Sequence, residues 1–466
     1  MNDVDTQILI IGGGIGGLTL AAILKKLEIP CKVIERTEQI TPVGAGISLA
    51  PNALRLLDQL GLYKSILELG QKLHRIRITR NTTYWNTIDW SLVEKWFGYP
   101  VISAERHSFH HCLYEAAGAE QTVILASKVT DIIDDPKEAS VQVVLEDGRR
   151  LRGRLVVGAD GIRSLTRRVL AGAANDKSTN TIRFTGRVHM SGITSPLEHL
   201  GPEEMGVGNW LLYDDSILTT WPCRDNQQWF IGVKAGILHE KDRQKSELTC
   251  AKCNNQKADS AEAEDRSVWA HATPETITSA YGDKFHPFAE KGRFSETPRS
   301  KEADDAIFKV VDRSVRILAS DVFEEIEFPS MSHGRVALLG DAAHSMTSFF
   351  GQGGCQAIED AAELANRLYE AASNSHAKLD DMSYGEISLV LREYSHRRKK
   401  RVQDLATFSS NYARLHTADL PLGLGPLVRH AIYRFMPSWG WMWYLRWLYG
   451  FQPSVDGLGE RHAERL

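Results

Sequence analysis

Three glycine-containing turns hold the residue types in this 466-residue chain that could do chemistry. The first, at residues 12–17, fits the pattern G-x-G-x-x-G with Gly12, Gly14 and Gly17. Gly12 permits a tight turn, Gly14 lets a pyrophosphate approach the backbone, and Gly17 lets a helix pack closely on a strand. Unpaired N–H groups at the start of that helix favour a bound phosphate, so this turn predicts a dinucleotide site.

The elements around this turn fit a nucleotide-binding unit. Residues 7–11 indicate a short buried strand, a helix is expected to extend to about residue 27, and residues 31–35 indicate a second strand. Glu35 ends that strand, close to the spacing of about 20 residues at which an acid holds a ribose hydroxyl. The opening is therefore a βαβ unit of an α/β protein, but these residues do not separate FAD from NAD.

Two later turns make that choice. Residues 158–161 read Gly-Ala-Asp-Gly, and residues 340–344 read Gly-Asp-Ala-Ala-His after a buried strand. In this order the three motifs resemble the class A FAD-dependent monooxygenases of the para-hydroxybenzoate and salicylate hydroxylase type, over about residues 5–410. The chain is similar in style to fungal natural-product tailoring monooxygenases.

The resemblance implies how FAD is held. Asp341 would bind the ribityl chain, and a helix starting at Gly353 and Gly354 would face the isoalloxazine and stabilise negative charge on it. Asp160 would serve FAD and nicotinamide together. The remaining cofactor contacts implied are Arg106 along the nucleotide, Ala45 and Gly46 beside the flavin, and Val129 at the adenine. His344 belongs to the third motif, and we expect a structural role for it. Ser348 departs from the proline common in the family.

The implied architecture is a Rossmann-like FAD-binding domain, discontinuous in sequence, with an inserted β-sheet substrate domain and a helical C-terminal region. The FAD-binding domain is assigned to residues 1–75, 100–180 and 305–370, the substrate domain to 76–99 and 181–304, and the helical region to 371–466. Polar stretches at residues 238–266 and around 291–306 are expected to be surface insertions.

The expected reaction uses NADPH or NADH as co-substrate and transfers one oxygen atom from O2, by hydroxylation or epoxidation. Arg187 is the first catalytic candidate, because its strand is similar to the flavin-facing strand of related enzymes and a guanidinium can hold a substrate oxygen. Tyr213 is the second candidate. His189 shares the face of Arg187 by strand alternation and is expected to be a packed histidine.

Abundant aromatic residues in the middle domain and tail favour a bulky aromatic or apolar secondary metabolite as the small-molecule substrate. Two other functions stay open. One is a flavin-dependent dehydrogenase or disulfide reductase, although the Cys250-x-x-Cys253 pair lies far from the first motif. The other is a non-catalytic flavin-fold binding protein. Such a protein could lose the motif at Asp341, but this chain retains it.

The composition and the residue pattern bear on three possible partners: nucleic acid, a metal ion and a membrane. A formal net charge of −4 provides no basic field for nucleic acid. Six scattered cysteines and the lack of a secretory pattern favour a cytoplasmic protein, and no metal site is expected. The tryptophan-rich tail at residues 420–451 has no apolar run of the roughly 20 residues that span a membrane. Its two interpretations are a helical cap on the body and peripheral contact with a membrane surface.

Overall fold

The computed structural model describes fourteen stretches of the chain. These are residues 5–42, 44–173, 182–198, 200–214, 216–236, 270–271, 277, 280–281, 310, 313–325, 330–347, 351–374, 379–417 and 420–459. The expected polar insertions, the pair Cys250 and Cys253, and Ser348 lie outside these residues.

The βαβ opening forms as expected. Strand β1 (Thr6–Ile11) leads through the glycine turn into helix α1 (Ile15–Lys26), and β2 (Cys31–Ile34) returns parallel to β1. Residues 15–24 of α1 are all buried, because this apolar helix packs on the sheet and on a second long helix. In register, Ile11 lies opposite both Ile34 and Gly158. The carboxyl ends of three strands therefore meet where the first and second motifs begin.

The nucleotide-binding sheet has eight strands in the described residues and is mostly parallel. Its main order is β18-β19-β11-β1-β2-β8, with β10 and β9 added in antiparallel pairing to β11. Besides β1 and β2, its strands are β8 (Val123–Ile124), β9 (Val129–Ile133), β10 (Val141–Leu145), β11 (Arg150–Gly158), β18 (Ser332–His333) and β19 (Val336–Leu338). The strand before the third motif, β19, thus joins β11 beside β1, although it lies far downstream in sequence.

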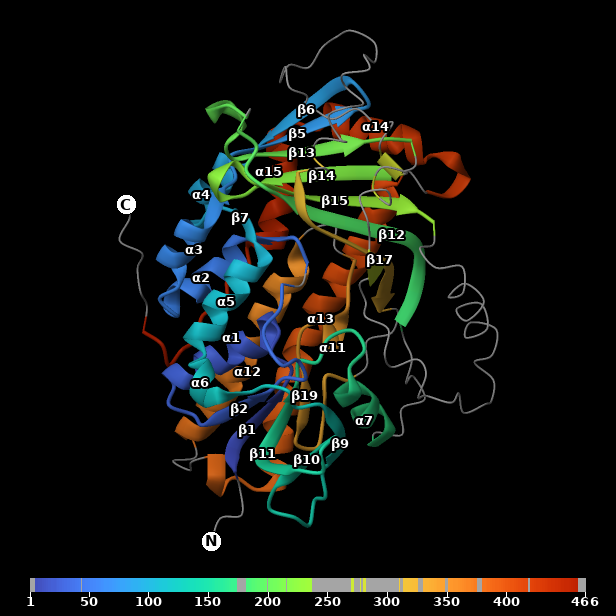
Figure 1. Cartoon of the computed structure of the whole chain (residues 1–466). Coiled ribbons are helices and arrows are strands. Elements are labelled where there is room, and N and C mark those ends of the chain that lie inside the picture. Colours follow the sequence, from blue (N-terminus) through green and yellow to red (C-terminus); the bar gives the residue numbers. More distant parts are fainter. Residues whose placement is uncertain are drawn as a thin grey trace.

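A second, large sheet carries the substrate domain, in the order β16-β17-β12-β15-β14-β13-β5-β6. Its strands are β5 (Arg75–Arg80), β6 (Thr83–Asp89), β12 (Ile182–Thr194), β13 (Val207–Leu212), β14 (Ser216–Pro222), β15 (Gln228–Ala235), β16 (Ala270–His271) and β17 (Ser314–Glu325). A small sheet of β3 (Gly46–Leu49), β7 (Ile102–Glu105) and β4 (Gly70–Lys72) stands beside it. Figure 1 shows the two large sheets at opposite ends of an elongated body.

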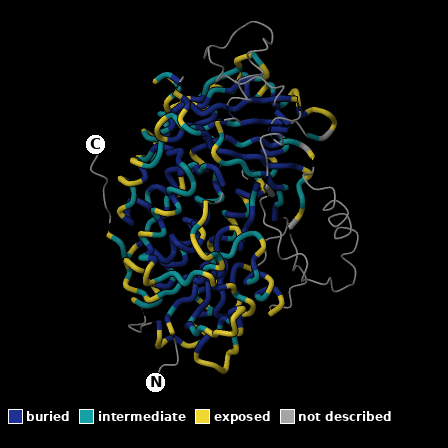
Figure 2. Tube along the Cα trace, in the orientation of Figure 1, coloured by how far each residue is buried: buried dark blue, intermediate teal, exposed yellow. Residues whose placement is uncertain are grey.

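Helices fill the space between and beside the sheets. They are α2 (Pro51–Gln59), α3 (Tyr63–Leu69), α4 (Ser91–Phe97), α5 (Arg106–Ala116), α6 (Ala119–Thr122), α7 (Leu165–Ala173), α11 (Asp341–His344), α12 (Gln352–Asn374), α13 (Tyr384–His416), α14 (Gly425–Phe435) and α15 (Ser438–Tyr449). The long helix α13 extends from the nucleotide-binding sheet to the large sheet (Figure 1). Most strands of both large sheets are buried, whereas the turns at their ends are exposed (Figure 2).

One assigned boundary needs correction. Residues 305–370 were assigned to the FAD-binding domain, yet β17 pairs with β12 over most of its length, from Ile182 opposite Glu325 to Thr194 opposite Ser314. The chain therefore stays in the large sheet until Glu325 and returns to the nucleotide-binding sheet at β18. Polar and charged residues interrupt the apolar alternation of β17, and most of its side chains are only half buried.

A buried ionic network fixes the third motif to the long helices. Arg398 on α13 donates from Nε to Asp360 Oδ1 at 2.7 Å and from Nη1 to Glu359 Oε2 at 2.8 Å. Asp360 Oδ2 accepts from the backbone N–H of Gly340 at 2.8 Å and from His344 Nε2 at 2.6 Å. His344 thus has the structural role expected from sequence, and α11, α12 and α13 are held at one point.

Charge balance makes this burial tolerable. Burial alone would raise the pKa of Asp360, but the neighbouring His344 and Arg398 hold it at about 2. Burial likewise opposes the ionised form of Glu359, and Arg398 together with Arg401 lowers its pKa nonetheless. Both carboxylates are therefore ionised at neutral pH, and removing one cation would leave an uncompensated buried charge.

The C-terminal helices cap the inner side of the large sheet. Tyr433 of α14 and Trp441 of α15 stack with ring centroids 5.7 Å apart, and both contact Trp210 of β13 edge-on. This is the helical C-terminal region expected from sequence. Within the described residues, no helix is both long enough and apolar enough to cross a membrane.

We predict that Arg398→Met lowers the free energy of unfolding by about 3–5 kcal/mol, because Glu359 and Asp360 would lose their buried cation. Chemical denaturation followed by circular dichroism measures this change. The matched control is Arg397→Met, since Arg397 is half exposed and pairs with Glu393 at the surface, where such a pair contributes at most about 1 kcal/mol. Equal stabilities of the two variants would contradict the role given to Arg398.

Candidate functional site

In the first glycine turn, the backbone at Gly14 is open to a ligand, whereas Gly12 and Gly17 are closely packed. Gly12 has a φ of +108°, and a Cβ there would lie 2.4 Å from the carbonyl oxygen of Ala159. A Cβ at Gly17 would lie 2.1 Å from the carbonyl oxygen of Gly12. At Gly14, the N-cap of α1, nothing lies within 4 Å of the same atom, and no side chain caps the helix. The described residues thus fit a pyrophosphate at Gly14.

The turn is held from two sides through the peptide groups of Gly13. Its N–H donates to Glu35 Oε2 at 2.7 Å, and its carbonyl oxygen lies 2.6 Å from Nε2 of His110. The other oxygen of Glu35 accepts from the backbone and hydroxyl of Thr37, both at 3.0 Å. Glu35 therefore stands at the end of β2 with its carboxylate fixed beside the turn, as a ribose contact requires.

His110 is a site residue that the sequence analysis did not find. Burial lowers its pKa, and the charge of Arg106 opposes protonation as well, so the neutral imidazole can donate its Nε2–H to Gly13. Arg106 and His110 both lie on α5, four residues apart, so their side chains share one face of the helix. That spacing from a motif arginine was the available sequence signal.

Arg106 and Asp341 interact electrostatically, the arginine partly buried and the aspartate exposed. Arg106 begins α5 directly after β7, and burial lowers its pKa, while the charge of Asp341 acts in the opposite direction. Asp341 begins α11 directly after β19 and is exposed. Within the described part of the chain, neither side chain has a hydrogen-bond partner. These two groups fit a polar ligand that would occupy the space between them.

The start of α12 adjoins the same space. A Cβ placed on Gly353 would lie 4.0 Å from Oδ1 of Asp341, and one on Gly354 would lie 3.0 Å from Ile47 of β3. The helix is 23 residues long, so its N-terminal N–H groups and partial positive charge are directed at this region. Gly353 and Gly354 are therefore placed together with Asp341.

Ala45 and Gly46 connect this space to the large sheet. The indole of Trp229 packs flat against Gly46, since a Cβ there would lie 2.1 Å from Cδ2 of the ring. Trp229 donates from Nε1 to the hydroxyl of Ser103 at 2.8 Å. Ala45 is buried in a small cluster with Ile193 and Trp229. The loop that carries Ala45 and Gly46 is thereby fixed to one face of the large sheet.

We call this face the inner face; it is lined by side chains that alternate along β12. Arg187, His189, Ser191 and Ile193 all belong to it and are all buried. Arg187 donates from Nη1 to the carbonyl oxygen of Thr185 at 3.0 Å and from Nη2 to the hydroxyl of Thr417 at 3.3 Å. Because Thr417 caps the C-terminus of α13, the arginine bridges the sheet and that helix. Burial lowers the pKa of His189 to about 4, so this imidazole is neutral at neutral pH.

Tyr213 does not join these residues. It is buried in the second core cluster together with Leu211 and Phe230, on the opposite, outer face of the sheet. Its ring packs against Tyr281 at a centroid distance of 6.1 Å. The structure therefore brings Arg187 and His189 together but places the second catalytic candidate on the other side of the sheet.

Asp160 and Val129 are less accessible to a ligand than Gly14, because the Asp160 carboxylate is already hydrogen-bonded and Val129 is half buried. The carboxylate of Asp160 accepts from Ser164 Oγ at 2.5 Å and from the backbone and hydroxyl of Thr166 at 3.0 and 3.1 Å, so it holds the turn before α7. Its backbone lies against Gly12. Val129 begins β9, half buried, opposite Leu145. Contacts of these residues with a cofactor stay predictions.

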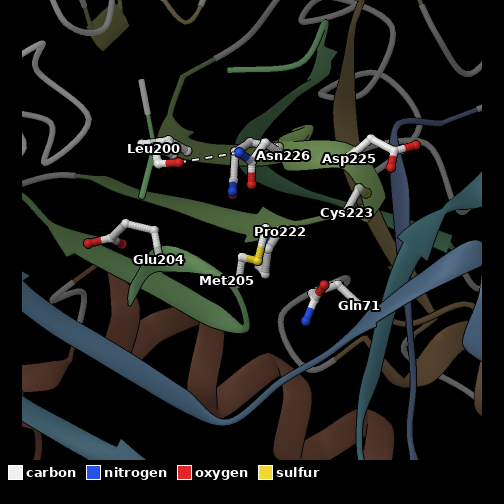
Figure 3. A pocket seen from close by; sticks show the side chains of 9 residues that line it. Gln71, Leu200, Glu204, Met205, Pro222, Cys223, Asp225 and Asn226 are labelled. Atoms are coloured by element: carbon white, nitrogen blue, oxygen red, sulfur yellow. Dashed lines mark hydrogen bonds between the residues drawn. The ribbon is translucent and has the colours of Figure 1, made fainter. Parts of the chain in front are cut away.

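A small hollow lies beside the large sheet, away from the residues described above. Figure 3 shows it beside the large sheet, lined by Gln71, Leu200, Glu204, Met205, Pro222, Cys223, Asp225, Asn226 and Gln228. Its volume is about 20 Å³, which is room for about one water molecule. As described, this hollow is too small to hold an organic molecule.

Known proteins are similar to this chain in sequence. The family described as FAD binding domain matches residues 5–277 and 323–409. The FAD-dependent monooxygenase pynG of Aspergillus niger is 46% identical over 465 residues, which cover 97% of each protein. The FAD-dependent monooxygenase pytG of Aspergillus terreus is 49% identical over 289 residues, which cover 62% of this chain and 80% of that protein.

Solved structures with low identity share the fold. HpxO of Klebsiella pneumoniae, complexed with FAD and uric acid, has a TM-score of 0.71 at 20% identity and covers 97% of this chain and 96% of its own. A substrate complex of salicylate hydroxylase has a TM-score of 0.66 at 19% identity and covers 98% and 99%. These matches extend over both sheets and the C-terminal helices.

We predict that Asp341→Ala yields largely flavin-free protein, because a carboxylate that accepts ribityl hydroxyl hydrogen bonds contributes roughly 1.5–3 kcal/mol. The ratio of flavin to protein absorbance in purified protein measures the effect. Asp381→Ala is the control, since Asp381 is also an exposed aspartate next to a helix. Normal flavin content in the Asp341 variant would refute its assignment.

We predict that Glu35→Ala weakens FAD binding by roughly tenfold without abolishing it, because one charged hydrogen bond is lost while the open turn at Gly14 remains. Titration of flavin-free protein with FAD measures the dissociation constant. Glu38→Ala serves as the control, because Glu38 is exposed and three residues away. An unchanged constant in the Glu35 variant would show that Glu35 does not hold the ribose.

Proposed function

Because the chain belongs to the FAD binding domain family and is an FAD-dependent monooxygenase, we propose that it inserts one oxygen atom from O2 into a bulky aromatic or apolar secondary metabolite. NADPH or NADH is the proposed source of electrons. One observation carries the proposal. Arg106 and Asp341, which have no hydrogen-bond partner among the described residues, and the start of α12 adjoin a sheet face with a buried arginine and a neutral histidine.

Bound FAD would supply the redox chemistry, taking electrons from the nicotinamide and passing one oxygen atom to the substrate. The residues of the chain would bind the cofactor, stabilise charge on it and exclude water. Gly14, Glu35 and Asp341 would hold the cofactor, and the N-terminus of α12 would stabilise negative charge on its ring. The packing of Trp229 on Gly46 would keep this loop closed and exclude water from the reacting groups.

Arg187 is the proposed catalytic residue. Hydrogen bonds to Thr185 and to Thr417 hold the guanidinium in one orientation on the inner face. A fixed cation of this kind can orient a phenolate or carbonyl oxygen of the substrate and stabilise charge that develops during oxygen transfer. His189 lies two residues away on the same face, and its neutral imidazole can donate or accept one hydrogen bond.

The inner face also supports an apolar substrate. Besides Arg187 and His189, it carries aromatic and aliphatic side chains from neighbouring strands. Those packed in the main core, where the C-terminal helices cover Trp210, are Trp210, Leu212, Ile217 and Val233. Those near the loop at Gly46 are Ile193, Trp229, Ile231 and Trp221. A surface of this composition favours a large ring system with few polar groups. The choice between hydroxylation and epoxidation depends on the substrate.

Oxygen uptake distinguishes this function from a flavin-dependent dehydrogenase and from a non-catalytic flavin-binding protein. The purified yellow protein is mixed with NADPH or NADH in oxygenated buffer, with and without candidate aromatic metabolites. We expect a substrate that stimulates both nicotinamide oxidation and O2 consumption, and a product that carries one ¹⁸O atom when ¹⁸O2 is used. A product that gains no oxygen would leave the dehydrogenase as the function.

We predict that Arg187→Leu retains FAD and its reduction by nicotinamide but slows oxygen transfer roughly 100- to 1,000-fold, the loss expected when one preorganised donor is removed. Product formed per nicotinamide consumed falls, and hydrogen peroxide appears instead. The matched control is Arg183→Leu on the same strand, where the arginine is exposed. Normal coupling in the Arg187 variant would show that this arginine only ties β12 to α13.

A further inference from the structure

Helix α15 exposes a row of three tryptophans, of which only Trp447 has a ring contact with another described helix, at Phe408 of α13. Trp439, Trp443 and Trp447 are 73%, 75% and 43% exposed, and their spacing of four residues places them on one side of the helix. We call these three residues the tryptophan ridge. Phe451, just beyond the helix, is 42% exposed. Large aromatic side chains on monomer surfaces are normally scattered singly, so a row of them indicates a binding surface.

The opposite side of α15 already secures the helix. Trp441, Met442, Leu445 and Leu448 are buried against the body, and the stacking of Trp441 on Tyr433 ties α15 to α14. The ridge is thus presented by a helix that is fixed without it. Replacing its outer residues should therefore leave the fold intact.

The charge of this surface has one sign. The chain contains 59 acidic residues, yet none lies between Leu420 and Val455, where the charged side chains are Arg429, Arg434 and Arg446. Arg446 is exposed on α15 between Trp443 and Trp447, whereas Arg429 is buried. On α14, Leu427 and Phe435 are 66% and 67% exposed. The charged side chains of the segment itself are thus all positive, and the nearby Asp404 of α13, one turn before Phe408, is paired with Lys400. Such an apolar surface is complementary to an anionic one.

We propose that the tryptophan ridge docks the protein on an anionic lipid surface. Indole rings bind at the boundary between headgroups and acyl chains, because the ring is apolar and its N–H can reach a polar partner. Arg446 lies at the right place for lipid phosphates or serine headgroups. With 12 residues, α15 is too short to span a bilayer and would lie in the plane of the interface. This inference does not depend on the reaction proposed above.

Co-sedimentation with vesicles tests the proposal directly. The flavin-loaded full chain is mixed with vesicles of phosphatidylcholine alone or of phosphatidylcholine with phosphatidylserine. We expect binding to the anionic vesicles that weakens as salt is raised, with a blue shift of tryptophan emission. The double variant Trp439→Ser/Trp443→Ser should partition roughly tenfold less or weaker still, and Arg446→Glu should lose the preference for anionic vesicles.

The matched control is Leu389→Ser, an exposed apolar residue near the start of α13. It lies 19 residues before Phe408, the residue of α13 that contacts Trp447, which is about 28 Å along a helix. The control should bind vesicles as the unaltered chain does, and flavin content and melting temperature should stay normal in every variant. Failure of the unaltered chain to bind, or equal binding by the double variant, would overturn the proposal. Self-association that only the double variant loses, without vesicle binding, would likewise overturn it in favour of a second copy.

Discussion

The ion pairs between Arg398 and the adjacent carboxylates of Glu359 and Asp360 are the interaction on which the rest of the structure depends. Two consecutive acids at the centre of α12 would be costly to bury unless cations matched them in place. Arg398 and Arg401 do so from α13, and Asp360 uses its remaining oxygen to hold Gly340 and His344. The start of α11, and with it Asp341, is therefore fixed by a charge balance between two long helices.

The parallel sheet supplies the second constraint. The carboxyl ends of β1, β2, β11 and β19 lie at one edge, so three motifs separated by more than 100 residues in sequence meet there. In open α/β sheets this edge is where ligands bind. The large sheet then closes the space from the other side, through Trp229 on Gly46 and through Arg187 on Thr417. The cofactor-binding and substrate-binding parts are thereby joined at the proposed reaction site.

Local patterns predicted the elements that depend on neighbouring residues. The strand, glycine turn and helix at residues 6–26 follow from short-range apolar and glycine patterns, and the family followed from the order of the three motifs. The Arg398 network could not be predicted, because it joins residues 38 and 39 positions apart whose burial depends on how α12 and α13 pack. Strand β17 was missed for a similar reason, since its place is determined by pairing with β12 and its own pattern is partly polar.

The two catalytic candidates, Arg187 and Tyr213, also show that local patterns do not predict how distant residues come together. Alternation along a strand predicts that residues divide between two faces, and it correctly grouped His189 with Arg187. Alternation within one strand does not predict how residues on different strands share a face. Tyr213 follows β13 whereas Arg187 lies on β12, so Tyr213 was chosen although it lies on the outer face. His110 was missed because its contact is with a backbone carbonyl, so that its spacing of four residues from Arg106 was the only pattern that pointed to it.

The most direct test of the account is a crystal structure of the protein with FAD bound. We expect the pyrophosphate at Gly14, the ribityl chain at Asp341, and the flavin ring between the start of α12 and the inner face that carries Arg187 and His189. A flavin ring that contacts neither α12 nor the inner face, or that lies on the outer face near Tyr213, would contradict both the assigned cofactor site and the proposed catalytic face.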